Sequence, residues 1–536
     1  MKKRILALFV ALVLTLTGVC ATLPASAAEP ANDDAAVAAG YVCKIVSANG
    51  SVTYYKYYSP LDLDAEGANK FVKDADGNWP AKSECAAQSV QEGDVIVLLT
   101  DLKLGKNSAY GNPNDDARGK NVQGATCYIR SHSCAITVDG NGKSITSFGG
   151  FIASNHDVTV RNLNFTLTGS EGIGHARNKH TLTFENCNFS IFGIRPEDKG
   201  DGYFCFNAGK DATLILKGCT VAMAENMAPK LPLFFSNQTG STLILEDTDV
   251  NYATFLSGKT PVPFSVSAAV NATADDFSLV MKGASKLTAT ANVLTAGGTV
   301  NVTLMDSSVL SATGSISTAL SLGKTASRVY VTDDATLDGG TPIAIDEKEG
   351  AATVILASSV AVKGFEAPKM IMSSIRTSGD ALGLRFTSVL SKESAAKAMT
   401  VGTVIVKKAD LANADFVAEE LAAAQIKFAG IEAKDGKTTA ADGSLIFSAA
   451  LTKLPSNSEA FAARSLAIYK LGGTAIVTAY SAFDAEEHSC SIESLAKEIK
   501  ADTKPAQSGG YRFEVTGGAF SRYTKEQYEK IVALVK

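Results

Sequence analysis

The sequence lacks the features that would indicate several common classes of function. It has no Cys-x-x-Cys motif and no cysteine/histidine quartet, which argues against a structural zinc site. Positive charge is not in excess, because 50 Lys and Arg face 55 Asp and Glu, for a net charge of -5. Nucleic acids attract lysine-rich surfaces, so this balance also argues against a nucleic-acid partner.

Aromatic residues and long apolar runs are also scarce. Aromatics make up 7% of the chain, and Trp79 is the single tryptophan. The one long apolar run, residues 5–16, follows the basic residues 2–4 and precedes Ala-Ser-Ala at 25–27. This pattern predicts a signal peptide over residues 1–28, with an apolar core too short for a membrane span. We therefore expect a secreted, extracellular protein, released or held non-covalently at the cell surface. Loss of three positive charges would change the net charge from -5 to -8.

The eight cysteines outside the predicted signal peptide could form disulfides in an exported protein. Their spacing suggests a bond between Cys127 and Cys134 and another between Cys43 and Cys85. Connectivity does not follow from sequence, so these four residues are disulfide candidates only.

A nine-residue pattern recurs through the middle of the chain. Its copies begin at Val158, Leu182, Leu214, Leu243, Leu279, Val302, Val329 and Val354, with a weaker copy at Ile136. The eight main copies start 23 to 36 residues apart. Irregular periods of this size indicate a solenoid whose loops vary while its core repeats.

Each position of the repeat has a physical meaning. The first and third positions are apolar, as in a strand with one buried face. The fifth position holds residue types that mostly tolerate a left-handed backbone, which predicts a corner. Its members are Asn162, Asn186, Gly218, Asp247, Gly283, Asp306, Asp333 and Ser358. The sixth position is mostly small, which suits a narrow interior; its members include Cys187, Cys219, Thr248, Ala284, Ser307 and Ser359.

A second strand-like stretch precedes most copies, as in "FIASN" from 151 and "PLFFSN" from 232. Two strands joined at a tight corner in every coil predict a mainly β protein with a right-handed parallel β-helix. A β-sandwich is the alternative, but the Asn-Gly loops typical of its hairpins are scarce.

Residues 90–365 resemble the pectate-lyase-like superfamily of parallel β-helices. "ITVDGNGKSIT" and "FENCNF" carry this resemblance. "EGDVIVLLTDLKL" at 92–104 resembles the first coil of secreted adhesin-like β-helix proteins of Gram-positive gut bacteria. These motifs imply the fold and leave the activity open.

The flanking regions complete a predicted organisation in five parts. Residues 1–28 are the signal peptide, 29–40 a disordered linker, 41–90 a β-rich N-terminal cap, 91–365 the β-helix and 366–536 a C-terminal accessory domain. The "DADGN" stretch in the cap resembles a calcium loop but lacks the full ligand series, so calcium is possible but unsupported and no other cofactor is expected.

The C-terminal domain is predicted to be α+β or sandwich-like. It resembles a module common at the C-terminal end of secreted Firmicutes proteins, through the stretches around Arg376, Arg385 and Arg464. Arg376 and Arg385 are ligand-binding candidates for an anion. Alternatively, they pair with local carboxylates such as Asp380.

One charged patch could carry catalysis. Its candidates are Glu171, His175, Arg177, Arg195, Asp198 and Asp201. Polysaccharide lyases on this fold need a carboxylate cluster for calcium and an Arg or Lys as base, and glycosidases need carboxylates on either side of the scissile bond. The motifs of the resembling enzyme families are absent, however, and a loop of mixed charge is usually solvated.

We therefore predict a non-catalytic, carbohydrate-binding or adhesin-like monomer whose partner is a polysaccharide or a host or cell-surface glycan. Tyr55, Tyr57 and Trp79 are candidates for stacking on sugars, although the tyrosines could equally pack within the cap. The first alternative is a polysaccharide lyase or glycoside hydrolase acting on pectin-like or host glycans, and the second is a structural spacer.

Overall fold

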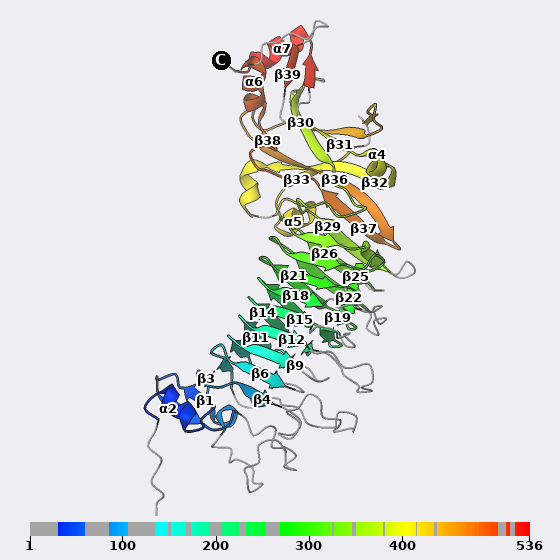
Figure 1. Cartoon of the computed structure of the whole chain (residues 1–536). Coiled ribbons are helices and arrows are strands. Elements are labelled where there is room, and N and C mark those ends of the chain that lie inside the picture. Colours follow the sequence, from blue (N-terminus) through cyan, green and yellow to red (C-terminus); the bar gives the residue numbers. More distant parts are fainter. Residues whose placement is uncertain are drawn as a thin grey trace, which may run out of the picture.

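The structure, a computed structural model, describes residues 30–58, 85–104, 134–147, 152–167, 173–191, 205–223, 232–252, 268–290, 292–323, 326–345, 350–378, 381–413, 415–433, 437–501, 511–514 and 520–535. The described chain forms an elongated stack of coils, with the N-terminal segments at one end and the C-terminal domain at the other (Figure 1).

Three parallel sheets run along the stack, and each full coil contributes one strand to each sheet. Sheet A contains β3 (Val95–Leu98), β5 (Ile136–Asp139), β8 (Val158–Arg161), β11 (Thr181–Glu185), β14 (Thr213–Lys217), β17 (Thr242–Glu246), β20 (Phe277–Lys282), β23 (Val300–Leu304), β26 (Ala326–Val331) and β29 (Ala351–Leu356). Sheet B, after the corner, contains β4 (Leu102–Leu104), β6 (Ser144–Ser147), β9 (Asn164–Leu167), β12 (Asn188–Ile191), β15 (Thr220–Met223), β18 (Asp249–Tyr252), β21 (Lys286–Ala289), β24 (Val309–Ala312) and β27 (Thr336–Asp338). Sheet C, before sheet A in each coil, contains β7 (Ile152–Ser154), β10 (Gly174–Ala176), β13 (Phe206–Ala208), β16 (Phe234–Ser236), β19 (Ala268–Ala272), β22 (Asn292–Ala296), β25 (Thr318–Leu322) and β28 (Thr341–Ile345).

This arrangement confirms the predicted fold class, a parallel β-helix with a β-rich cap and a separate antiparallel C-terminal part. The expectation of two strands per coil was too low, because the chain forms a third strand beyond the corner. Next to "TLTFENCNFS", Phe184 comes from sheet A, Phe189 from sheet B and Phe206 from sheet C, on the β13 strand that begins the next coil. The ring of Phe189 makes edge contacts with the other two at 5.1 and 5.3 Å between centroids. Aromatic rings prefer this geometry, so one side chain from each sheet fills the interior.

The corner prediction holds at seven of its eight positions. Asn162, Asn186, Gly218, Asp247, Gly283, Asp306 and Asp333 all have φ between 48° and 63°. Ser358 does not have a positive φ, and it lies where the chain leaves the β-helix. At Gly218 an added Cβ would lie 2.6 Å from Oδ1 of Asn186, so glycine is favoured there by space as well as by φ.

The small residue after each corner points inward, as predicted, but the register shifts by one in the later coils. Cys187, Cys219, Thr248, Ser285 and Ser308 form one column of fully buried side chains. The predicted members Ala284 and Ser307 are therefore wrong, because the corner gains one residue from β20 onward. The predicted member Ser359 is wrong as well, because it is exposed where the chain leaves the β-helix. Cys219 Sγ donates to the carbonyl oxygens of Phe184 and Lys217 at 3.3 and 3.4 Å. Thr248 Oγ1 makes the equivalent bonds one coil later, so the thiols act as hydroxyl-like donors.

The N-terminal cap contains α2 (Asp33–Ala38), β1 (Cys43–Val46), β2 (Val52–Tyr55) and α3 (Ala86–Ser89). The expectation of disorder over 29–40 is wrong for α2. Asn32 caps this helix by accepting from the Ala35 amide at 2.9 Å. Asp33 then accepts from Lys44 Nζ at 2.7 Å and from the Tyr54 hydroxyl at 3.0 Å, which fixes the helix on β1 and β2.

Both ends of sheet A are covered. β1 adds antiparallel to β3 at the first coil, and β37 (Ala475–Tyr480) adds parallel to β29 at the last. Sheet A therefore continues into the C-terminal domain through β36 (Phe461–Gly472), β32 (Ala398–Lys407) and β33 (Phe428–Glu432). Solenoid ends need such covers, because exposed strand edges invite further pairing.

The C-terminal domain adds a second, antiparallel sheet, sheet D, ordered β30 (Lys369–Arg376), β31 (Gly383–Leu390), β35 (Leu445–Thr452) and β34 (Thr438–Thr439). The remaining elements are α4 (Lys392–Lys397), η4 (Lys408–Asn413), α5 (Ala418–Ala423), β38 (Ser489–Cys490), α6 (Ile492–Ala501), β39 (Tyr511–Glu514), β40 (Phe520–Tyr523) and α7 (Lys525–Val532). One buried cluster joins sheet D to α6 and α7. A second places α5 against Tyr330 and Ile355 on the outer face of sheet A.

Candidate functional sites

The outer face of sheet B carries an ordered row of amide and hydroxyl groups, here called the polar ladder: Asn164, Asn188 and Thr220. Asn188 Nδ2 donates to Asn164 Oδ1 at 2.9 Å, and Thr220 Oγ1 donates to Asn188 Oδ1 at 2.6 Å. Asn164 Nδ2 in turn donates to the carbonyl of Gly142 at 3.2 Å. Parallel register places these residues directly beside one another, so each side chain holds the next.

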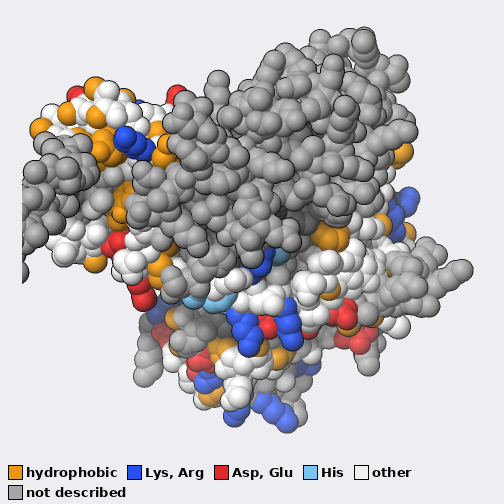
Figure 2. Space-filling view, turned by 90° about the horizontal axis from the view of Figure 1, so that it is seen from below, with side chains coloured by type: hydrophobic (Ala, Val, Ile, Leu, Met, Phe, Trp, Pro, Cys, Tyr) orange, Lys and Arg blue, Asp and Glu red, His pale blue; other side chains and the backbone are white. Residues whose placement is uncertain are grey.

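The outer face of sheet A carries a second row, the charge ladder, in which signs alternate from coil to coil. Its members in register are Asp139, Arg161, Glu185, Lys217, Glu246 and Lys282. Arg161 pairs with Asp139 at 2.8 Å, and Glu246 pairs with Lys282 at 2.8 Å and Lys217 at 3.1 Å. Seen from the N-terminal end, basic and acidic side chains are likewise interspersed (Figure 2). The faces described therefore present mixed charge.

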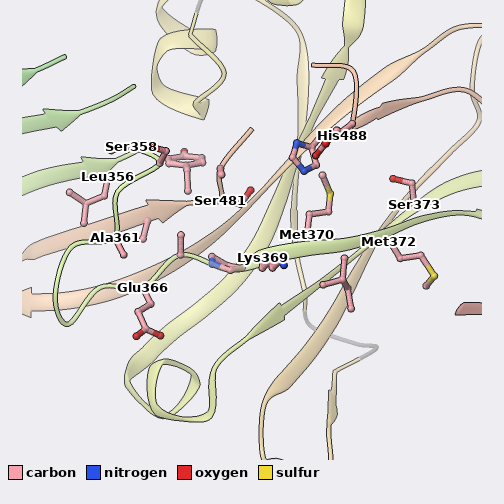
Figure 3. Close-up of a pocket in the computed structure, with 18 of the residues that line it drawn as sticks. Leu356, Ser358, Ala361, Glu366, Lys369, Met370, Met372, Ser373, Ser481 and His488 are labelled. Carbon is pink, nitrogen blue, oxygen red and sulfur yellow. The ribbon is translucent and has the colours of Figure 1, made fainter. Parts of the chain in front are cut away.

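A cavity of about 720 Å³ lies where the β-helix meets the C-terminal domain. We call it the junction slot; segments 356–373 and 479–490 line it, together with Leu495 and Glu498 of α6. Figure 3 shows Lys369, Met370 and Met372 along one side of the slot, with His488 and Ser481 facing them from the other segment. Its volume falls within the range of about 300–1,000 Å³ common for ligand sites.

The edge of strand β30 forms one wall of the slot. Among the described strands β30 pairs with β31 alone, with a β-bulge between Met370 and Met372. Near its end, the N–H of Ile375 donates to the Tyr523 hydroxyl at 3.0 Å, and its carbonyl accepts from the same hydroxyl at 3.2 Å. Ile375 thus turns both backbone groups away from β31.

The opposite wall is the segment that leads into β38. His488 is held through its carbonyl, which accepts from the Ala463 amide, and through Nδ1, which accepts from the Asp484 amide at 2.8 Å. The imidazole stacks on Phe483 with ring centroids 5.8 Å apart. Burial lowers the pKa of His488 below its usual value, so the ring is neutral at pH 7 with its proton on Nε2.

Carboxylates outnumber cations in the slot lining, which includes Glu366, Glu486, Glu487 and Glu498 but only one lysine, Lys369. Glu366 accepts from the hydroxyls of Ser391 and Ser394, and hydrogen bonds from these two lower its pKa. Glu486 pairs with Lys408 at 2.7 Å. Burial raises the pKa of Glu498 above its usual value. The slot is therefore acidic, and part of its negative charge is desolvated.

Arg464 links three segments of the chain close to the slot. Its guanidinium is buried and donates to the carbonyls of Ser481, Phe416 and Ala357 at 2.7, 3.1 and 2.6 Å. It also lies over the Tyr480 ring, 5.5 Å from the centroid. Burial lowers its pKa to about 10, which leaves it charged at pH 7. One side chain thus joins the last coil, the segment before α5 and the end of β37.

The predicted catalytic patch is only partly within the described residues. Glu171, Arg195, Asp198 and Asp201 lie outside them. His175, on the outer face of β10, is in register with Asn207 of β13. Burial, with a smaller contribution from Arg177, lowers the pKa of His175 to about 4. All three carboxylates of the patch lie outside the described residues, so the catalytic patch stays a prediction.

The cap tyrosines divide between the two faces of their strand. Tyr55 packs on the hydrophobic core, whereas Tyr54 points outward to Asp33 and lies 6.0 Å from the Tyr41 ring. Tyr57 is half-buried, and its carbonyl accepts from the Ala86 amide. Trp79 lies outside the described residues. This placement of Tyr55 agrees with packing within the cap and not with a role in stacking on sugars.

The other candidates are placed as follows. Arg385 is paired in register with Ser374, which puts it diagonal to Arg376 on one face of sheet D. Asp380 and Cys127 lie outside the described residues. Cys43, Cys85 and Cys134 are buried thiols, and burial raises the pKa of Cys43. The two predicted disulfides stay predictions.

Sequence reasoning did not single out the junction slot. None of the slot's acidic residues was a candidate, and Arg464 was only part of a motif. Sequence reasoning also overlooks β32, although "TVGTVIVK" has the β-branched character of a buried strand. Slot residues more than 100 positions apart carry no pattern that would associate them.

No protein-family model, curated protein or solved structure matches the chain. Within the described residues, no three His, Cys, Asp or Glu side chains lie close enough to hold a metal ion. The described helices are all too short or too polar to cross a membrane.

Proposed function

We propose that this chain is a secreted, non-catalytic carbohydrate-binding protein, adhesin-like, of the pectate-lyase-like superfamily. The observation that carries the proposal is the polar ladder of Asn164, Asn188 and Thr220 on the outer face of sheet B. Amides and hydroxyls both donate and accept hydrogen bonds, which suits the hydroxyl groups of a sugar chain.

The ladder offers these groups in a form that favours binding. Its residues repeat at the strand spacing of about 4.8 Å, along the direction in which a linear polysaccharide would lie. Hydrogen bonds between neighbouring side chains hold the amide planes in place before a ligand arrives. Pre-ordered groups lose less conformational entropy on binding, so the same contacts yield more affinity.

Two further observations fit binding on the outer surface without proton transfer by His175. The described cavity inside the β-helix, lined by residues such as Leu214, Phe234 and Val270, has a volume of only about 10 Å³. A ligand would therefore have to bind outside the coils. The low pKa of His175, about 4, also makes it a weak proton acceptor at neutral pH.

The test measures binding and product formation on the same glycans. Purified protein is applied to immobilised pectins and host glycans, and reducing and unsaturated ends are assayed in parallel. We expect binding without products, and a loss of at least about 10-fold in affinity for Asn188→Ala combined with Thr220→Ala. Thr336→Ala is the matched control, because Thr336 lies in the same outward column several coils away.

The alternatives give different results. Release of reducing or unsaturated ends would establish a lyase or hydrolase and reject the non-catalytic proposal. Absence of binding to every glycan would favour a structural spacer. Binding that the ladder variant leaves unchanged would place the glycan site elsewhere on the molecule.

A further inference from the structure

We propose that the junction slot binds an extended peptide segment that bears lysine or arginine side chains and pairs with the free edge of β30. This inference does not depend on glycan binding, because it concerns another part of the molecule. It rests on the orientation of the slot walls, on the backbone groups of β30 and on the charge of the lining.

The lining shows that strand edges, and not strand faces, border the cavity. A strand that turns its face to a cavity contributes every second residue. Here residues 369–373 all line the slot, and so do residues 486–490 on the other side. Consecutive residues can share a cavity in this way when the backbone itself runs along it. The slot therefore has the form of a gap between two sheet edges.

The hydrogen bonds of Ile375 show which backbone groups face the gap. Its N–H and carbonyl both bond to the Tyr523 hydroxyl, on the side away from β31. Alternation along a strand turns the groups of Ser373, two residues earlier, to the same side. Tyr523 thus occupies the edge at Ile375, and the edge beside Ser373 borders the cavity. An added strand would find a donor and an acceptor there.

The lining defines the chemistry of the incoming strand. Glu366 and Glu486 are already engaged by serine hydroxyls and by Lys408. Among the described residues, Glu487 and Glu498 have no ion-pair partner, so a cationic side chain in the slot would meet both. Met370 and Met372 are flexible and polarisable, and they adapt to varied apolar side chains. Strand addition takes affinity from the backbone and specificity from alternate side chains.

The test uses full-length protein and synthetic seven-residue probes with a fluorescent label. One probe alternates lysine with valine, a second has glutamate in place of lysine, and a third is the lysine probe with alternate backbone amides N-methylated. We expect the lysine probe to bind at least about 10-fold more tightly than either of the others, and less tightly at high salt. Equal binding of the glutamate or N-methylated probe would overturn the proposal.

Variants of the protein locate the site. Ser373→Pro removes the edge N–H, and proline is tolerated on edge strands, so we expect loss of binding with an unchanged melting temperature. Glu487→Gln with Glu498→Gln should weaken the lysine probe by about 10-fold, whereas Glu493→Gln, on the same helix α6 but outside the slot lining, should not. If Ser373→Pro does not fold, the glutamine variants and the N-methylated probe still test whether the peptide binds in the slot through its backbone and its charge. A dimer of the free protein that Ser373→Pro abolishes would instead identify a second copy as the occupant, contrary to the proposal.

Discussion

In the β-helix, one coil repeats the contacts of the next: seven corners share a left-handed residue, and one buried column runs from Cys187 to Ser308. In the C-terminal domain, by contrast, individual side chains form hydrogen bonds that no neighbouring element repeats. Arg464 joins the carbonyls of Ala357, Phe416 and Ser481, which lie far apart in sequence. Arg328 and Tyr330 of β26 reach Glu420 and Asp415 in the same way.

This difference predicts where the molecule tolerates change. In a solenoid, stability is close to a sum of similar nearest-neighbour terms, so the loss of one contact leaves the others intact. A buried cation that holds three segments has no such substitute. The C-terminal domain should therefore be sensitive to a few residues, and the β-helix to corner geometry more than to any single surface contact.

The largest effect should come from Arg464→Met. Removing the guanidinium leaves three buried carbonyls without their donor, and each unsatisfied buried acceptor typically costs about 1–3 kcal/mol, so the total loss should be about 3 kcal/mol or more. Urea denaturation followed by circular dichroism should show early unfolding of the C-terminal domain, and hydrogen exchange should rise first in β36 and α5. The matched change in the β-helix, Arg161→Met, removes a half-exposed pair with Asp139 and should cost less than about 1 kcal/mol. Equal losses in the two variants would contradict the comparison.

The second effect concerns a corner. Asn186→Val places a β-branched residue at φ 51°, which should destabilise the β-helix by about 1–3 kcal/mol. Asn186→Gly is the control, because glycine adopts this angle without strain, so its melting temperature should stay close to that of the parent. A melting temperature for the valine variant equal to that of the glycine variant would show that the corner is not a constraint on stability.

The comparison also explains how far sequence alone could predict the structure. The β-helix was predictable because its corners and apolar positions recur, so eight weak signals supported one register. Ala284 and Ser307 were misplaced because one inserted residue moves the inward side chain by one position, and that insertion leaves the pattern of residue types unchanged. The helix α2 was missed because its stability depends on Asp33 meeting Lys44 and Tyr54, contacts that the local composition does not reveal.

The candidate sites show the same division. The polar ladder and the charge ladder follow from register, so an alignment of the copies could have revealed them: Asn164, Asn188 and Thr220 occupy one column of it. The junction slot could not be predicted, because β30 and residues 486–490 meet only through the folding of the whole C-terminal domain. Sites built from repeated positions can be predicted from one sequence, whereas sites built from long-range contacts cannot.

A third, smaller effect would test whether the buried column depends on donors or on volume. Cys219→Thr retains a donor of the kind that Thr248 already provides, so we expect a change within about 1 kcal/mol. Cys219→Val has a similar shape without a donor and should cost about 1–3 kcal/mol. Thermal unfolding of the two variants under reducing conditions makes the comparison. If valine is tolerated as well as threonine, packing alone accounts for the column.

The smallest effect should come from the charge ladder, where Glu246 lies between two lysines. Hydrogen bonds from Lys282 and then Lys217 hold the pKa of Glu246 below its usual value in the folded protein. A depressed carboxylate pKa contributes stability above the unfolded pKa, and this contribution is lost as pH falls through the folded pKa. Because these groups are partly exposed, Glu246→Gln should lower stability at pH 7 by less than about 1 kcal/mol, and by less still at high salt.

The control for this prediction is Glu185→Gln in the same row. Glu185 lies in register between Arg161 and Lys217, but Arg161 is paired with Asp139 and Lys217 with Glu246. Its neutralisation should therefore change the acid limb of the stability curve less than that of Glu246, and melting temperatures between pH 3 and pH 7 (about the range where carboxylates titrate) make the comparison. If both variants keep the acid limb of the parent, the ion pairs of this row make no measurable contribution to stability.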